Sequence, residues 1–251
     1  STEAGAKAAL SHTGALTGTD EVFGAVFKQY GVYRAETIDE FLDAVRGFSM
    51  LPIPKGPRTL VMTTAGGVGI MMADHLAKCS LEMPETPEDV QRRLKELLPF
   101  AGVKNPLDVT AQVNTKPELF RQFMEVALSS GRYDAAIVFS GFMGLMSERV
   151  DQRIDDLKSV AEKFPHIPII PVTLCNDESL KKFIDSGLAV LEDPTRAVKM
   201  LHALNEYRRM TALPRETVQP FERPQDMAGG GYPEAPALTE YDSKRLFARF
   251  G

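Results

Sequence analysis

Residues 11–18 form a run of small and hydroxyl side chains that holds Ser11, His12, Thr13 and Gly14. A histidine in such a run can present a ring nitrogen to a substrate, and neutral imidazole is a competent nucleophile near neutral pH. Its small neighbours leave room for a bulky phosphoryl group. The alternative is a structural histidine whose ring bonds to a backbone carbonyl. The run by itself does not decide between them.

A glycine-rich turn follows at Thr64, Ala65, Gly66, Gly67 and Gly69, between an apolar run and a helical pattern. Backbone amides at the start of a helix, together with the positive end of its dipole, form a site for an anion. The turn is not a P-loop, because no Lys-Ser or Lys-Thr pair follows the glycines, and it lacks the third glycine of a dinucleotide fingerprint. A tight turn with no ligand is the alternative.

Two later segments are also candidates: 105–108, which comes ahead of a predicted helix, and 140–144, which follows the predicted strand that ends at Phe139. In Asn-Pro-Leu-Asp at 105–108, Pro106 holds Asn105 in an extended or turn conformation from which its amide can project. Asp108 could orient a neighbour or balance a cation, and a simple Asx turn is the alternative. Phe142 and Met143 could wall an acyl pocket, although core packing is the alternative that we favour.

These segments are separated by regularly alternating elements. The apolar runs predict strands, and the 3.6-residue patterns between them predict helices. The predicted strands are 59–64, 135–139 and 167–172, with shorter ones near 81 and at 189–191, and the predicted helices are 67–78, 87–98, 117–129, 147–164, 177–186 and 194–209. This alternation predicts an α/β fold: a flavodoxin-like, doubly wound parallel sheet of about five strands. Ligands are then expected at the carboxyl ends of the strands.

The amino-terminal part departs from this alternation. Apolar spacing predicts a helix that Gly31 ends, a short strand at 32–34 and a second helix that begins at a Thr37–Glu40 capping box. One short strand cannot make a sheet, so these helices must cover apolar surface of another segment. We therefore expect extra N-terminal helices from a truncated neighbouring domain.

Composition excludes several classes of function. The chain has 29 Lys and Arg against 34 Asp and Glu, a net charge of −5, which argues against a nucleic-acid partner. No apolar run is long enough to cross a membrane. The two cysteines, Cys79 and Cys175, have no further Cys or His at ligand spacing, so we expect no metal site, no disulfide scaffold and a cytoplasmic location.

Four segments, in order, resemble the NDP-forming (ADP-forming) acyl-CoA synthetase family, relatives of succinyl-CoA synthetase. Ser-His-Thr-Gly-Ala-Leu at 11–16 is similar to its phosphohistidine segment, and the glycine turn at 64–69 to that of its next flavodoxin-like domain. Asn-Pro-Leu-Asp at 105–108 is similar to that domain's Asn-Pro-x-Asp element. Residues 238–245 are similar to the entry helix of its ATP-grasp module.

The resemblance implies a phosphoryl relay. An acyl-CoA thioester is phosphorolysed to an acyl phosphate, the phosphoryl group passes to His12, and the phosphohistidine delivers it to ADP. The glycine turn would bind phosphate, and Ser11, Thr13, Gly14, Asn105 and Asp108 would support the site. CoA, ATP or ADP and Mg²⁺ would be required in a full-length parent, with a carboxylic acid as substrate, and family analogy suggests a homo-oligomer.

The resemblance also implies the domain organisation. Residues 1–54 would be the end of a succinyl-CoA-ligase-like flavodoxin domain, 58–210 a second such domain, 211–236 a linker and 237–251 the start of an ATP-grasp module. The CoA-binding and most of the ATP-grasp domains would be missing, so this piece alone should be inactive. The alternative is a non-catalytic regulatory or scaffold portion of a protein acetyltransferase with the same architecture.

Overall fold

The computed structural model describes residues 20–114, 116–212 and 239–247, and the segment with His12 lies outside them. The chain divides into two compact units, Ser1–Leu213 and Pro214–Gly251. The described part of the second unit is one helix, α10 (Glu240–Phe247). In the described ranges, no helix is both long enough and apolar enough to span a lipid bilayer.

A parallel sheet forms the centre of the first unit. Its strands are β1 (Thr59–Thr63), β2 (Leu107–Asp108), β3 (Ala135–Phe139) and β4 (Ile169–Val172), in the spatial order β2-β1-β3-β4. Every neighbouring pair is parallel. This order is the doubly wound, flavodoxin-like one, so the predicted fold class is confirmed.

The sheet has four named strands in the described residues, where we predicted about five. The segments near 81 and at 189–191 each contribute one parallel bridge, Arg58 to Glu82 and Val172 to Leu191. A single residue pair is too short to count as a strand. Conversely, β2 escaped prediction because two residues show no periodicity. The predicted strand at 32–34 is wrong: no described strand lies beside it to supply a partner.

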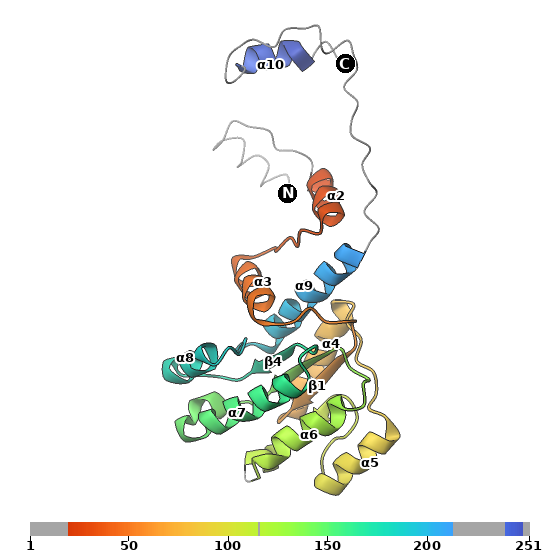
Figure 1. The fold of residues 1–251 in the computed structure, drawn as a ribbon, viewed down its shortest axis with the longest axis vertical. Helices are drawn as coiled ribbons and strands as arrows, with labels where there is room; N and C mark the ends of the chain where they lie inside the picture. Colours follow the sequence, from red (N-terminus) through yellow and green to blue (C-terminus); the bar gives the residue numbers. More distant parts are fainter. Residues whose placement is uncertain (1–19, 115, 213–238, 248–251) are drawn as a thin grey trace. The chain divides into compact units, whose positions relative to one another are not determined.

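Helices cover both faces of the sheet (Figure 1). One face packs on α4 (Gly66–Lys78) and α9 (Pro194–Ala212), and the other on α5 (Glu88–Leu97), α6 (Glu118–Leu128) and α7 (Ser147–Lys163). Strand side chains alternate between the two: Leu60 and Met62 join one core and Val61 the other. A further helix, α8 (Asp177–Asp185), adds Phe183 to the core with α6 and α7. Because α9 runs to Ala212, the first two residues of the predicted linker are helical.

The amino-terminal helices are α2 (Asp20–Tyr30) and α3 (Ile38–Met50). Thr37 caps α3 as predicted, accepting a 3.1 Å hydrogen bond from the amide of Glu40. The Glu40 carboxylate accepts a hydrogen bond from the hydroxyl of Tyr33. α3 is fastened to α9 because the guanidinium of Arg196 donates two hydrogen bonds, of 2.7 and 2.8 Å, to the buried carboxylate of Asp43.

The outer face of α3 is apolar and exposed. Five of its large side chains keep between 37% and 79% of their surface open to solvent: Ile38, Phe41, Leu42, Val45 and Phe48. A groove of about 540 Å³ runs beside this face. Soluble chains rarely leave such a contiguous apolar patch uncovered. We therefore still expect these helices to pack against apolar surface of another segment.

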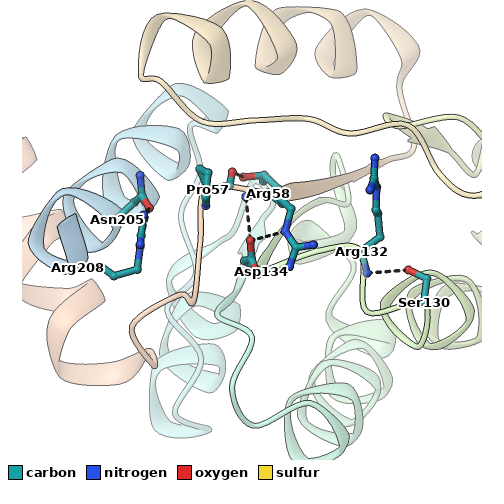
Figure 2. Close-up of polar contacts among 8 residues, drawn as sticks. Pro57, Arg58, Ser130, Arg132, Asp134, Asn205 and Arg208 are labelled. Carbon is teal, nitrogen blue, oxygen red and sulfur yellow. Dashed lines mark hydrogen bonds and ion pairs between the residues drawn. The ribbon is translucent and has the colours of Figure 1, made fainter. Parts of the chain in front are cut away.

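An ion pair lies at the amino-terminal edge of the sheet, between Arg58, just before β1, and Asp134, just before β3 (Figure 2). Arg58 donates side-chain hydrogen bonds of 2.7 and 2.8 Å to both carboxylate oxygens of Asp134. Gly56 lies so close that an added Cβ would stand 2.4 Å from the Asp134 carboxylate. Burial alone would raise the pKa of Asp134, but the hydrogen bonds and charge of Arg58 outweigh it and hold this pKa below its ordinary value.

Asp134→Asn should lower the free energy of unfolding by about 1–3 kcal/mol at neutral pH. Because the folded-state pKa of Asp134 is depressed, its stabilisation is complete above the ordinary value of 3.8 and is lost as the pH falls through the folded value. Urea unfolding followed by circular dichroism, at neutral pH and at about pH 3, measures both effects. The control is Asp185→Asn, which removes an exposed pair with Lys181. Equal losses for the two variants would contradict the prediction.

Candidate functional site

The turn from β1 into α4 exposes backbone amides at the carboxyl edge of the sheet. The Thr63 hydroxyl closes the turn, donating to the carbonyl of Ala65 and accepting from its amide, both at 2.9 Å. Ala65 is the N-cap of α4 and has no side-chain capping bond. Amides in a first helical turn, here those of Gly66 and Gly67, have no partner inside their helix. This end of α4 is therefore polarised positively.

A carboxylate already lies at this helix end. Asp108 is paired with Thr63 across β1 and β2, and its Oδ1 accepts a 2.9 Å hydrogen bond from the amide of Thr110. Its other oxygen, Oδ2, would be 3.0 Å from a Cβ added to Gly66. Glycine at 66 makes room for this approach. The predicted Asx turn is present, and the carboxylate also adds negative charge where an anion would bind.

The loops after β3 and β4 are tied together beside this turn. The Thr173 hydroxyl donates a 3.0 Å hydrogen bond to the carbonyl of Gly141 and accepts one of 2.9 Å from the amide of Gly144. A Cβ added to Gly144 would be 2.4 Å from the carbonyl oxygen of Leu174, so only glycine fits there. Gly141 in turn lies against Thr64. Hydrogen bonds and close packing between loops thus form the edge between β1 and β3, where strand order reverses.

The side chain of Asn105 bonds to the backbone of β1, on the amino-terminal side of this edge. Its Oδ1 accepts from the amide of Val61 at 2.9 Å, and its Nδ2 donates to the carbonyls of Thr59 and Pro84 at 2.7 and 3.1 Å. Because β2 pairs with β1 only at Met62 and Thr63, the side chain of Asn105 completes the pairing of β1 before β2 begins. Gly69 approaches the adjoining Pro106, to which an added Cβ would be 3.1 Å away.

The other residues that the sequence singled out have different outcomes. Ser11, His12, Thr13 and Gly14 lie outside the described residues. Phe142 is 65% exposed, so the core role that we favoured for it is wrong, whereas Met143 is buried. Cys175 stays near the edge, but burial and the nearby Glu192 raise the pKa of its thiol to about 11, which disfavours a reactive thiolate.

The chain is similar in sequence to a known domain family and to known ligases. The profile of the succinyl-CoA ligase-like flavodoxin domain matches residues 1–48. The alpha subunit of ADP-forming acetate–CoA ligase I from Pyrococcus furiosus is 31% identical over 216 residues, which is 85% of this chain and 46% of that protein. The 4-hydroxybutyrate–CoA ligase (ADP-forming) of Nitrosopumilus maritimus is 34% identical over 111 residues, 44% of this chain and 16% of that protein.

A solved structure shows the same fold. It is the dinucleotide-forming acetyl-coenzyme A synthetase 1 of Ca. Korarchaeum cryptofilum in complex with phosphate and ADP. The TM-score is 0.71 at 26% identity, over 83% of this chain and 45% of that one. Over most of its length, this chain is thus similar to the alpha subunits of ADP-forming acetate–CoA ligases. It spans about half the length of the relatives that it matches most extensively.

The sequence analysis did not single out three threonines whose hydroxyl groups shape the carboxyl edge of the sheet. Thr63, Thr110 and Thr173 each follow or end a strand, and each bonds to loop backbone or carries a turn. A threonine at a strand's carboxyl end is a signal that was present in the sequence. The partners of Thr63 and Thr110 lie two residues further along the chain, whereas those of Thr173 lie in the loop after β3, which no local pattern indicates.

Asn105→Ala should lower the free energy of unfolding by about 2–4 kcal/mol, because it leaves the amide of Val61 and the carbonyl of Thr59 without these bonds. Chemical denaturation measures the loss. Asn176→Ala is the matched control, since Asn176 caps the exposed start of α8 and its removal should cost only about 1 kcal/mol. A loss at Asn105 no larger than at Asn176 would refute its role in completing β1.

Asp108→Asn should strengthen binding of inorganic phosphate to the chain by roughly fivefold, because it removes about 1 kcal/mol of repulsion at the start of α4. Phosphorus NMR titration reports the affinity. Asp74→Asn, on the same helix, serves as the control and should change little. Unchanged or weaker phosphate binding by Asp108→Asn would show that the carboxylate does not oppose an anion there.

Proposed function

We propose that this chain is part of an acid–thiol ligase that couples thioester formation between a carboxylic acid and CoA to a nucleoside triphosphate. The observation that carries the proposal is the match to the alpha subunit of an ADP-forming acetate–CoA ligase over 85% of the chain. The glycine turn and the positive end of α4, at the edge where doubly wound folds bind ligands, support it.

In this proposal His12 is the nucleophile of a reversible relay, described here from thioester to nucleotide; thioester formation runs the same steps in reverse. Phosphate attacks the thioester carbonyl and releases CoA, which leaves an acyl phosphate. A ring nitrogen of His12 then attacks phosphorus and the carboxylate leaves, and the phosphohistidine finally transfers its phosphoryl group to ADP. The adduct is anionic, and the first amides of α4 at Gly66 and Gly67 would stabilise it without requiring a basic surface. This suits a chain with a net charge of −5.

Asn105 and Asp108 take supporting roles. Asn105 sets the position of β1, and therefore of the turn that follows it, through its bonds to strand backbone. Asp108 shapes the loop after β2 through its bond to the amide of Thr110, and its other carboxylate oxygen lies close to Gly66 at the start of α4. In the part of the chain that the structure describes, no group of three or more His, Cys, Asp or Glu could hold a metal ion, so we assign no Mg²⁺ step to these residues.

The domain organisation belongs to the same proposal. Residues 1–54 end one succinyl-CoA-ligase-like flavodoxin domain, 58–210 form a second, 211–236 link it onward and 237–251 begin an ATP-grasp module. The exposed apolar face of α3 supports the first assignment, because the rest of a flavodoxin-like domain would cover it. CoA-binding and ATP-grasp portions would complete a cytoplasmic enzyme, and the chain alone should turn nothing over.

The decisive experiment follows the phosphoryl group. The intact parent is incubated with labelled ATP and Mg²⁺, and acid-labile, base-stable label on His12 is sought by mass spectrometry. His12→Ala should abolish both the label and nucleotide-dependent CoA ligation, because no other group accepts the phosphoryl. His166→Ala, an exposed histidine elsewhere, should retain both. Full activity without His12 would refute the relay, and an unlabelled wild-type protein would favour the regulatory alternative.

A further inference from the structure

A cavity that the phosphoryl relay does not use opens at the amino-terminal edge of the sheet. Its volume is about 340 Å³, which lies at the lower end of the range of small-molecule sites. It is formed where α6 and α7 end and where the chain enters β1, β3 and β4. Its wall carries four basic side chains, Lys55, Arg58, Lys163 and His166, and one carboxylate, that of Asp134.

Three of these basic groups keep donors open to solvent. Arg58 uses Nε and Nη2 on the carboxylate of Asp134, so Nη1 has no partner among the described residues, and the side chain is 39% exposed (Figure 2). Lys55 and His166 are exposed, and their side chains have no hydrogen-bond or ion-pair partner in the described ranges. A ligand that enters the cavity can therefore reach these donors without breaking an existing bond.

The charges around the cavity leave one cation uncompensated. Arg58 is paired with Asp134, and Lys163 is paired with Glu125. Among the charged residues at this cavity that the structure describes, only Lys55 has no opposite charge beside it, in a chain whose net charge is −5. This balance favours a ligand with one negative charge, because a second would be repelled by the carboxylates of Asp134 and Glu125.

The floor of the cavity is apolar and partly aromatic. Leu128 and Tyr133 are 2% and 3% exposed, and Phe164 and Ile167 are partly buried beside them. The hydroxyl of Tyr133 already bonds to that of Thr86 at 2.9 Å, so the floor offers a ligand no further polar group there. A small ion would leave this surface in contact with water, whereas a flat hydrocarbon ring would cover it. The floor therefore favours an anion that carries an aromatic ring.

We propose that this cavity is a binding site for a small aromatic monocarboxylate, whose carboxylate pairs with Lys55 and with Nη1 of Arg58 and whose ring contacts Leu128 and Phe164. Lys55 lies three residues before Arg58 and has a flexible stem, so the two cations can bond to the two oxygens of one carboxylate. The site uses neither His12 nor the turn into α4. Failure of the phosphoryl relay would therefore leave this site intact, and its own failure would leave the relay intact.

The test uses the whole wild-type chain, labelled with ¹³C in its four histidines, and benzoate as the probe. The His166 signal is assigned by its loss in His166→Gln. At constant pH and ionic strength, benzoate should shift this signal saturably in the millimolar range and leave the signal of His75, on α4, unchanged. Benzamide has the ring without the charge, and acetate has the charge without the ring. In competition with benzoate, each should bind at least tenfold more weakly.

Lys55→Gln should weaken benzoate binding by about tenfold, because the uncompensated charge is lost. Lys158→Gln is the matched control, since Lys158 is an exposed lysine on α7 that does not line the cavity, and it should bind benzoate like wild type. Arg58 is left intact because its loss would also break the pair with Asp134. The proposal is overturned if benzoate leaves His166 unshifted or shifts His75 equally, if benzamide or acetate binds as tightly, or if Lys55→Gln binds benzoate as well as wild type.

Discussion

The parallel pairing of β1 with β2 on one side and β3 on the other is the interaction on which the candidate site depends. Parallel pairing sends the carboxyl ends of these strands to one edge, so loops that are far apart in sequence meet there. β1 is buried throughout, and its short partner β2 covers only its last two residues. Asn105 completes that pairing with a side chain, which makes a single amide part of the sheet.

Although the chain as a whole is acidic, it places positive charge at particular points of the structure. At the start of α4 the positive character comes from backbone amides, and Asp108 partly balances it. On α7 a single positive charge, the guanidinium of Arg153, is withdrawn from water and packed against the ring of Phe120. The start of α4 suits an anion that must also be released, because backbone amides bind an anion without a fixed counter-charge.

The amino-terminal helices show how the two parts of the first unit are joined. Asp43 on α3 is almost fully buried and is held by Arg196 on α9, while Arg46 donates a 2.8 Å hydrogen bond to the carbonyl of Val190. Gly47 allows Met200 to approach closely. These polar contacts fix the orientation of α3 on α9 and on the segment before it. They leave the apolar face of α3 exposed to solvent.

The sequence by itself determined the alternation of elements, the α/β class and the places where loops carry glycine and hydroxyl residues. Periodicity is a local property, and seven helices from α3 to α9 lie within a few residues of their predicted bounds. Tertiary structure decided the rest. The two-residue β2, the bonds of Asn105 to β1, the approach of Asp108 to Gly66 and the packing of Arg153 on Phe120 all depend on partners distant in sequence. Pairing of strands and burial of charge are properties of the assembled core, and no pattern along a single segment encodes them.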